Sequence, residues 1–268
     1  MKDIKLIAAD MDHTLLTEKG ELPPQFEDYI FELNKLGVDF SIASGRPLYT
    51  LTNIFSNLIN EMTFISDNGG AISHKGELIF TSLIDAEKYK EMIAFSESET
   101  GGVGILCGLN SAYVSSKHKQ YENFLRTFYS KITFVDDLQD VTVDANKFTI
   151  YFPDKKSKEM YDTVFHPRFG SDFSITIGDT IWIDIMNKNV DKGQAMRLLG
   201  KKLDITSDQM MAFGDTYNDI EMLRAVKYSY IVANANDDMR QYANYVTKSN
   251  DEYGVTLVLE KLIQIMSE

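Results

Sequence analysis

The sequence of 268 residues contains almost no cysteine, since Cys107 is the only one. A single thiol excludes an intramolecular disulfide and is typical of proteins in reducing compartments. No segment reaches the roughly 18 consecutive apolar residues that a membrane-spanning helix needs. The N-terminal residues lead directly into an apolar run, so we expect no cleaved signal peptide. These absences predict a cytoplasmic protein with no membrane partner.

Basic residues are also scarce, because 27 Lys and Arg are set against 40 Asp and Glu, for a formal net charge of -13. Proteins that bind nucleic acid rely mainly on stripes of Lys and Arg. The charge balance therefore argues against a nucleic-acid partner, and we expect a monomer or a weak homodimer. Hydrophobic residues make up 44% of the chain, which is enough for one large domain or two smaller ones.

Among the abundant acidic residues, Asp10 and Asp12 form the most informative pair. They follow the apolar run 4–9, which predicts a buried strand. Two carboxylates this close together repel each other unless they share a cation or a proton, so the pair indicates a metal site. The alternative is that these aspartates only form a turn or cap a helix.

Three later segments also place polar residues at the end of a predicted strand or the start of a predicted helix. They supply Ser44, Gly45 and Arg46 after residues 38–43, Lys192 in the first turn of a helix, and Asp215, Asn218 and Asp219 after residues 210–213. In open parallel sheets, ligands bind in the crevice outside the carboxyl ends of the strands. We therefore expect these residues to converge on one crevice.

The order of the predicted elements indicates an α/β sheet interrupted by a module of another kind. At the front, two strands joined by a helix that ends at Gly37 form a βαβ unit, whose strands should be parallel. In the middle, alternating residues 173–177 and 181–185 predict an antiparallel hairpin around the turn at Gly178 and Asp179. A helix is expected over residues 119–129.

After Lys192 the alternation of helices and strands returns. The predicted fold class is therefore α/β, with a Rossmann-like parallel-sheet core and a second, inserted α+β cap domain. The predicted boundaries are 1–82 and 188–268 for the discontinuous core and 83–187 for the cap.

Four ordered motifs together resemble those of the haloacid dehalogenase superfamily, and within it the Cof-like hydrolases. They are Asp10-Met11-Asp12-His13-Thr14, Ser44-Gly45-Arg46, Lys192, and Gly214-Asp215-Thr216-Tyr217-Asn218-Asp219. The resemblance covers essentially the whole chain, and the insertion between the second and third motifs is similar to the α/β cap of this branch. It implies phosphate-ester hydrolysis through an aspartyl-phosphate.

The resemblance implies a role for each acidic residue. Asp10 is the nucleophile, and Asp12 protonates the leaving alkoxide and later activates water. A hard divalent cation should offset the repulsion between carboxylate and phosphate, so Mg²⁺ is the predicted cofactor. Asp10 and Asp215 would bind it through side chains and Asp12 through its backbone carbonyl. Asp219 would hold a metal-bound water, or would only cap a helix.

The predicted substrate-binding groups are hydrogen-bond donors around the phosphate. They are Ser44, the backbone N–H groups of Met11 and Gly45, the side chains of Lys192 and Asn218, and Arg46. Arg46 has a structural salt bridge as its alternative. His13 either narrows the entrance or points outward, and the loop 67–70, with Asn68, either borders the substrate or is an ordinary glycine turn.

These observations predict a phosphatase that acts on a small phosphorylated metabolite, such as a sugar phosphate or a cofactor phosphate like pyridoxal phosphate. The cap would select the substrate by closing over the crevice. Two alternatives remain. A phosphomutase would return the phosphoryl group to its substrate, and a sugar-phosphate-binding regulator would keep the pocket without turnover.

Overall fold

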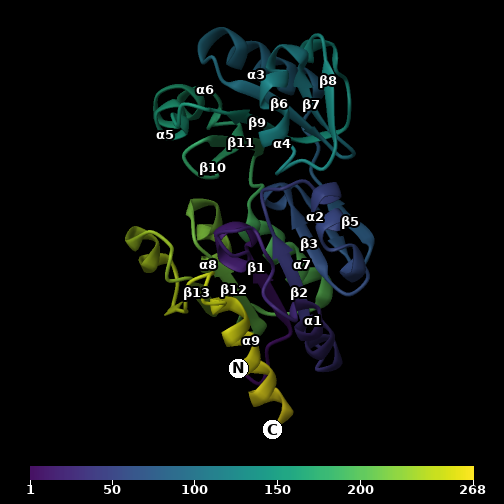
Figure 1. The fold of residues 1–268 in the computed structure, drawn as a ribbon, viewed down its shortest axis with the longest axis vertical. Helices are drawn as coiled ribbons and strands as arrows, with labels where there is room; N and C mark the ends of the chain where they lie inside the picture. The colour runs from purple at the N-terminus through teal and green to yellow at the C-terminus, as the bar shows by residue number, and fades with distance from the viewer.

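The computed structural model describes residues 1–268 and contains two β-sheets, one above the other along the long axis of the molecule (Figure 1). The larger sheet consists of β1 (Leu6–Ala9), β2 (Asp39–Ala43), β3 (Thr63–Ser66), β4 (Ala71–His74), β5 (Glu77–Thr81), β12 (Met210–Gly214), β13 (Tyr228–Ile231) and β14 (Tyr245–Val246). Their order in space is β14-β13-β12-β1-β2-β3-β4-β5. Neighbouring strands from β14 to β3 run parallel, and β4 and β5 are antiparallel additions at one edge.

Helices cover both faces of this sheet, which explains why β1 is apolar throughout. The side chains of Ile7 and Ala9 face one cluster, and those of Leu6 and Ala8 face the other. The first cluster includes residues of α1 (Phe26–Lys35), α2 (Leu48–Ile54) and α9 (Gly254–Ser267), and the second includes residues of α7 (Lys192–Leu203) and α8 (Ile220–Arg224). A parallel strand buried on both faces requires apolar residues at every position. None of the helices has the length and hydropathy required to cross a bilayer.

The smaller sheet lies entirely within the middle of the sequence. It consists of β6 (Val103–Gly108), β7 (Ala112–Ser115), β8 (Ile132–Val135), β9 (Ala145–Tyr151), β10 (Phe173–Ile177) and β11 (Trp182–Asn187), in the order β10-β11-β9-β6-β7-β8. Helices α3 (Ala86–Glu99), α5 (Ser157–Met160) and α6 (His166–Phe169) pack on one face, and α4 (Glu122–Leu125) packs on the other.

The predicted boundaries fall in the connections between the two sheets, since residue 83 lies between β5 and α3, and residue 188 lies between β11 and α7. We call residues 83–187 the cap and the remainder the core. That the two parts are separate domains stays a prediction. The arrangement of a mainly parallel α/β sheet with a second, mixed sheet agrees with the predicted fold class.

Two local predictions differ from the structure. The helix predicted over 119–129 is a 3₁₀ segment, Ser116–Tyr121, followed by the short α4. Beyond α4 the chain contacts the core, where the backbone N–H of Ser130 donates to Thr50 Oγ1 at 3.0 Å. The hairpin of β4 and β5 was not predicted, although its turn at Lys75 and Gly76 has the positive φ angles typical of tight hairpins.

Candidate active site

The ends of β1, β2 and β12 meet because β1 pairs in parallel with both other strands. Ala9 lies opposite Ile42 on one side and opposite Phe213 on the other. The backbone N–H of Asp10 donates to Phe213 O at 3.0 Å, which continues the pairing past the end of the strand. The residues that follow the three strands are therefore brought to a single edge. This edge is the switch point where the strand order reverses, the usual ligand crevice of such sheets.

An irregular turn over Met11–Leu15 follows β1 and separates apolar from polar side chains. The side chains of Met11 and Leu15 are buried in the core, whereas Asp12 and His13 line a cavity. This separation requires an extended backbone at Asp12 and a left-handed one at His13, with φ of 61°. The structure thus favours the alternative in which His13 narrows the entrance.

Three carboxylates form the centre of the site. One oxygen from each of Asp10, Asp215 and Asp219 lies within 4.8 Å of the other two. Burial, together with the charges of the neighbouring carboxylates, raises the pKa of Asp10 and raises that of Asp215 to about 7. The raised pKa values mean that the three carboxylates have too little positive charge nearby to keep all of them ionised. An all-oxygen donor set of this kind fits Mg²⁺.

Lys192 supplies part of that charge from the first turn of α7. Its Nζ lies 2.5 Å from Asp10 Oδ1 and 2.7 Å from Asp219 Oδ1, and its side chain is fully buried. Burial alone would lower the pKa of Lys192, but the two carboxylates outweigh it and raise the pKa, so the ammonium stays charged. Asp191 caps the helix by accepting from the N–H of Gln194.

Asp219 is engaged through both of its oxygens. Oδ1 accepts from Lys192, and Oδ2 accepts from the backbone N–H groups of Asp215 and Thr216 at 3.0 and 3.2 Å. The carboxylate lies so close to Gly214 that a Cβ there would be 2.6 Å from Asp219 Cβ. This geometry favours the capping alternative for Asp219, and a role in holding a metal-bound water stays a prediction.

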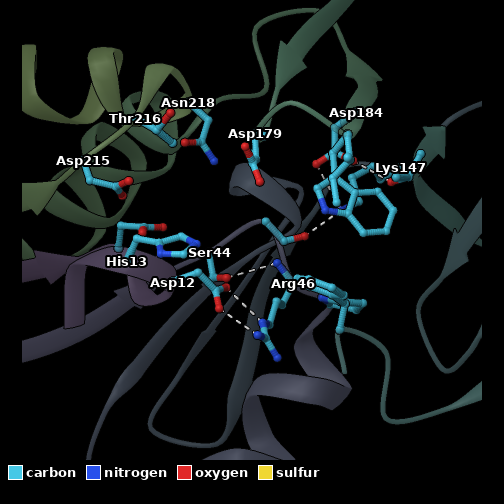
Figure 2. A pocket seen from close by; sticks show the side chains of 18 of the residues that line it. Asp12, His13, Ser44, Arg46, Lys147, Asp179, Asp184, Asp215, Thr216 and Asn218 are labelled. Atoms are coloured by element: carbon cyan, nitrogen blue, oxygen red, sulfur yellow. Dashed lines mark hydrogen bonds and ion pairs between the residues drawn. The ribbon is translucent and has the colours of Figure 1, made fainter. Parts of the chain in front are cut away.

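Asp12 and Arg46 form a bidentate ion pair at the entrance (Figure 2). Arg46 Nε donates to Asp12 Oδ2 at 3.0 Å and Nη2 donates to Oδ1 at 2.7 Å. The same guanidinium reaches the cap, where Nη1 donates to Thr127 O at 2.7 Å and the group lies 5.0 Å from the ring centre of Phe128. The salt-bridge alternative therefore describes Arg46 in this structure, and its assignment to the substrate stays a prediction.

The other predicted phosphate donors lie around the same edge. Ser44 lines the cavity, and its Oγ accepts from the N–H of Arg46 at 3.1 Å. The N–H of Gly45 has no hydrogen-bond partner within the protein. Asn218 Nδ2 donates to Asn68 Oδ1 at 3.0 Å, so one of its amide hydrogens is already engaged.

A buried polar network joins core and cap and was not predicted. Lys147 Nζ donates to Gly45 O at 2.5 Å and to Asp184 Oδ2 at 3.3 Å, while Thr149 Oγ1 donates to Asp184 Oδ1 at 2.5 Å. From the core, Asn68 Nδ2 donates to Asp184 Oδ2 at 2.7 Å. The loop with Asn68 is therefore a contact between the two parts, not an ordinary turn.

The sequence contains a weak signal for this network. In β9 and β11, Lys147, Thr149 and Asp184 lie on one face, and the apolar Phe148 and Ile183 point to the opposite face. Such alternation is typical of a strand with one face in water. Because the polar face packs against the core instead, only the tertiary structure places these residues in the site.

The cavity between core and cap has a volume of about 590 Å³. The core side includes Asp10, Asp12, Ser44, Arg46 and Asp215, and the cap side includes Phe124, Phe128, Lys147, Asp179 and Trp182. Gly178 and Asp179, the predicted hairpin turn, also line it. The structure thus brings together most of the predicted site residues and adds a wall from the cap.

Comparison with known proteins is consistent with this geometry. The sequence profile of the haloacid dehalogenase-like hydrolases matches residues 7–259, and the chain belongs to this family. The chain is similar to the 5-amino-6-(5-phospho-D-ribitylamino)uracil phosphatase YbjI of Escherichia coli K12, with 29% identity over 267 residues and 97% of each chain covered. The phosphatase of the same name from Bacillus subtilis 168, YcsE, is 25% identical over 257 residues, which cover 94% of this chain and 93% of that one.

Among solved structures, SMU.1108c from Streptococcus mutans UA159 superposes with a TM-score of 0.92. It is 30% identical, and the match covers 97% of this chain and 99% of that chain. The predicted family and fold class, and the prediction of an enzyme, are thereby confirmed.

Proposed function

We propose that this protein is a Mg²⁺-dependent phosphatase that releases inorganic phosphate from small phosphorylated metabolites. The observation that carries the proposal is the arrangement of two carboxylates on one cavity. Asp10 is fixed by Lys192 beside Asp215, and Asp12 is held separately by Arg46. A nucleophile and a proton donor with different partners are what a two-step hydrolysis requires.

In the first step, a carboxylate oxygen of Asp10 attacks phosphorus, and the bond between phosphorus and the ester oxygen breaks. Asp12, after it has left its ion pair with Arg46 and taken up a proton, gives that proton to the leaving alkoxide. In the second step, Asp12 takes a proton from a water molecule that attacks the phosphorus of the aspartyl-phosphate, and Asp10 is released together with inorganic phosphate. Dividing the reaction in this way replaces one very slow step by two faster ones.

The cofactor would be held by the side chains of Asp10 and Asp215 and by the backbone carbonyl of Asp12. When bound, Mg²⁺ supplies positive charge that offsets the repulsion between the carboxylate and the phosphate dianion. The hydrogen bond from Thr14 Oγ1 to Asp215 Oδ1, at 2.8 Å, orients that carboxylate. The free N–H of Gly45, with Ser44, Lys192 and the N–H of Met11, would bind the phosphate oxygens.

Candidate substrates follow from the cavity and from the relatives. A volume of about 590 Å³ suits a metabolite of moderate size. Three relatives are named as phosphatases of a ribitylaminouracil phosphate, so a ring linked to a phosphorylated polyol chain is one candidate, beside sugar phosphates and pyridoxal phosphate. We further propose that the enzyme works in the cytoplasm as a monomer or weak homodimer, without a nucleic-acid or membrane partner.

The test is a panel of phosphorylated metabolites incubated with the purified protein and Mg²⁺, scored for free phosphate. We expect phosphate release that stops when the metal is chelated. Asp10→Asn should abolish the release while its thermal unfolding stays close to that of the wild type. Conversion of a substrate to its isomer without free phosphate would indicate a phosphomutase, and binding without any conversion would indicate a regulator.

A further inference from the structure

We propose that the cavity selects phosphate monoesters whose alcohol part carries no second negative charge and presents a flat, unsaturated ring. The proposal rests on the phosphatase activity proposed above and concerns the part of the substrate that faces the cap. Asp179 at the hairpin tip would repel an anionic group, and the aromatic side chains of Phe124, Phe128 and Trp182 would contact the ring.

The charges that line the cavity are the first observation. Six carboxylates face it, and the only Lys and Arg side chains among the lining residues are Arg46 and Lys147. The lining carboxylates are those of Asp10, Asp12, Glu18, Asp179, Asp184 and Asp215. Anionic groups of ligands are normally held by Arg or Lys. The cavity therefore needs a free cation if it is to accept a second phosphate or a carboxylate.

Both of these cations already have partners. Arg46 is paired with Asp12 at 2.7 Å, and Lys147 is 2% exposed and bonded to Asp184 and to the backbone. The imidazole of His13 is hydrogen-bonded to Glu18 at 3.2 Å. Releasing Arg46 or Lys147 for a ligand would leave Asp12 or Asp184 without its partner, which is unfavourable in a largely buried site. No cation on the cap side is free for a second anionic group.

Of the two cap carboxylates that line the cavity, Asp179 and Asp184, only Asp179 has no positively charged partner. It lies in the turn between β10 and β11, its side chain is exposed, and it forms no ion pair within 4.0 Å. Figure 2 shows it between the core carboxylates and the Lys147–Asp184 pair. A ligand group that extends from Asp10 toward the cap passes this unpaired charge. Like charges a few ångströms apart in a partly solvated site disfavour binding by about tenfold or more.

The aromatic surface is the second observation. The rings of Phe124 and Trp182 are nearly parallel, with 5.9 Å between centroids and 12° between planes, and Phe128 meets Trp182 edge to face at 5.2 Å. Trp182 is fixed in the cap, whereas Phe124 and Phe128 are only half-buried and keep open surface toward the cavity. Flat rings gain specific contact with such surfaces, and puckered aliphatic rings gain less.

The test uses four phosphate esters of primary alcohols. They are benzyl, cyclohexylmethyl, para-carboxybenzyl and para-(aminomethyl)benzyl phosphate. The benzylic alcohols are similar to one another in acidity and more acidic than cyclohexylmethanol, so the ring preference is judged by its change in Phe124→Leu. We expect kcat/KM for the benzyl and aminomethylbenzyl esters to exceed that for the carboxybenzyl ester about tenfold or more. The benzyl ester should exceed the cyclohexylmethyl ester by about threefold to tenfold.

Two variants connect these preferences to the residues. Asp179→Asn should raise the ratio of carboxybenzyl to benzyl hydrolysis about tenfold, because it removes only the charge. Asp172→Asn changes an exposed carboxylate of the cap that does not line the cavity, and should leave this ratio as it is. Phe124→Leu should lower the ratio of benzyl to cyclohexylmethyl hydrolysis toward one.

Equal hydrolysis of the benzyl and carboxybenzyl esters would overturn the proposed selection against charge. An unchanged ratio in Asp179→Asn would overturn the role of Asp179, and an unchanged ring preference in Phe124→Leu would overturn that of the aromatic surface. All three outcomes leave the phosphatase proposal intact, since phosphate is released in each. No release from any of the four esters by enzyme that releases phosphate from the metabolite panel would overturn this proposal alone. No release from the metabolite panel would overturn the phosphatase proposal and this one with it.

Discussion

The core side of the cavity consists of charged and polar side chains that follow the ends of strands. The cap side consists of side chains on one face of β9 and β11 and of aromatic side chains. In the core, Asp10, Lys192 and Asp219 are buried and bonded to one another. In the cap, Phe124 and Asp179 keep open surface toward the cavity. A rigid, mutually fixed set of charges suits bond making and breaking, and a more open surface suits selection. Substitutions in the core should therefore lower kcat, and substitutions in the cap should change which substrates are preferred.

Several contacts join the two sides, and three of them involve Arg46, Lys147 and Asp184, which line the cavity. Arg46 reaches Thr127 and Phe128, Lys147 reaches Gly45, and Asn68 reaches Asp184. Each contact joins a residue of the cap to the loops that follow β2 or β3. Substitutions of these residues test whether the cap is coupled to the chemistry or only covers it.

The largest effect is expected for Lys192→Met. Removing the ammonium leaves the buried carboxylates of Asp10 and Asp219 without their protein cation, so kcat should fall by about 10³-fold, and the free energy of unfolding by about 3 kcal/mol. Phosphate-release kinetics and thermal denaturation measure the two effects. Lys201→Met, an exposed position on the same helix, is the control. A variant with near-normal kcat would contradict the role of Lys192.

The second effect concerns Arg46→Ala, which removes both hydrogen bonds to Asp12 and the bond to the cap. We expect kcat to fall by about 10²-fold, because the proton donor loses its fixed position. Arg46→Lys should recover little, since an ammonium cannot replace a bidentate guanidinium. Arg224→Ala, on the surface of α8, is the control. If Arg46→Ala changes only KM, the residue acts on substrate binding and the positioning role is wrong.

The third prediction concerns Asp67, which lies beside Lys147 and is fully buried. Burial raises the pKa of Asp67 to about 6 despite the opposing charge of Lys147. The folded protein thus keeps this proton at a pH where the unfolded chain has lost it, and stability falls as pH rises from about 4 to about 7. Relative to Asp67→Asn, the wild type should lose about 2 kcal/mol over this range. The free energies of unfolding of both proteins are measured by urea titration at several pH values. If they change with pH by the same amount in the wild type and in Asp67→Asn, this expectation is contradicted.

The smallest effect is expected for the core–cap contact of Asn68, whose φ is 54°. Asn68→Gly tolerates this backbone but loses the bonds to Asp184 and Asn218, so the free energy of unfolding should fall by about 1 kcal/mol. Asn68→Ala adds backbone strain and should lose about 1 kcal/mol more. If urea unfolding gives the same free energy for both variants and the wild type, the contact between Asn68 and the cap does not stabilise the folded protein.

The core half of the site could be predicted because its residues follow strands in the sequence. Asp10, Ser44 and Asp215 each come directly after an apolar run, and parallel pairing brings such positions to one edge. The roles of Asp219 and Arg46 could not be decided from the sequence. An aspartate can either cap a helix or bind a metal-bound water, and an arginine can either contact a phosphate or form a structural salt bridge. Only hydrogen bonds seen in the structure bear on the alternatives. Asp219 accepts from the backbone N–H groups of Asp215 and Thr216, and Arg46 donates to Asp12.

The cap half could not be predicted, for a different physical reason. The alternation in β9 and β11 shows that Lys147 and Asp184 share a face, but it does not show whether that face meets water or another sheet. Asn68 lies in a loop whose sequence is that of an ordinary glycine turn. Its contact with Asp184 spans 116 residues of sequence, so no local pattern contains it.

Asp10 is the residue that accepts the phosphoryl group in the proposed reaction. The direct measurement is to quench the enzyme during turnover of a substrate with Mg²⁺, reduce it with borohydride and analyse its peptides by mass spectrometry. Borohydride converts an aspartyl-phosphate to homoserine, so we expect homoserine at position 10, and none when the substrate is omitted. Homoserine at another aspartate, or none at all under conditions where phosphate is being released, would contradict the central claim.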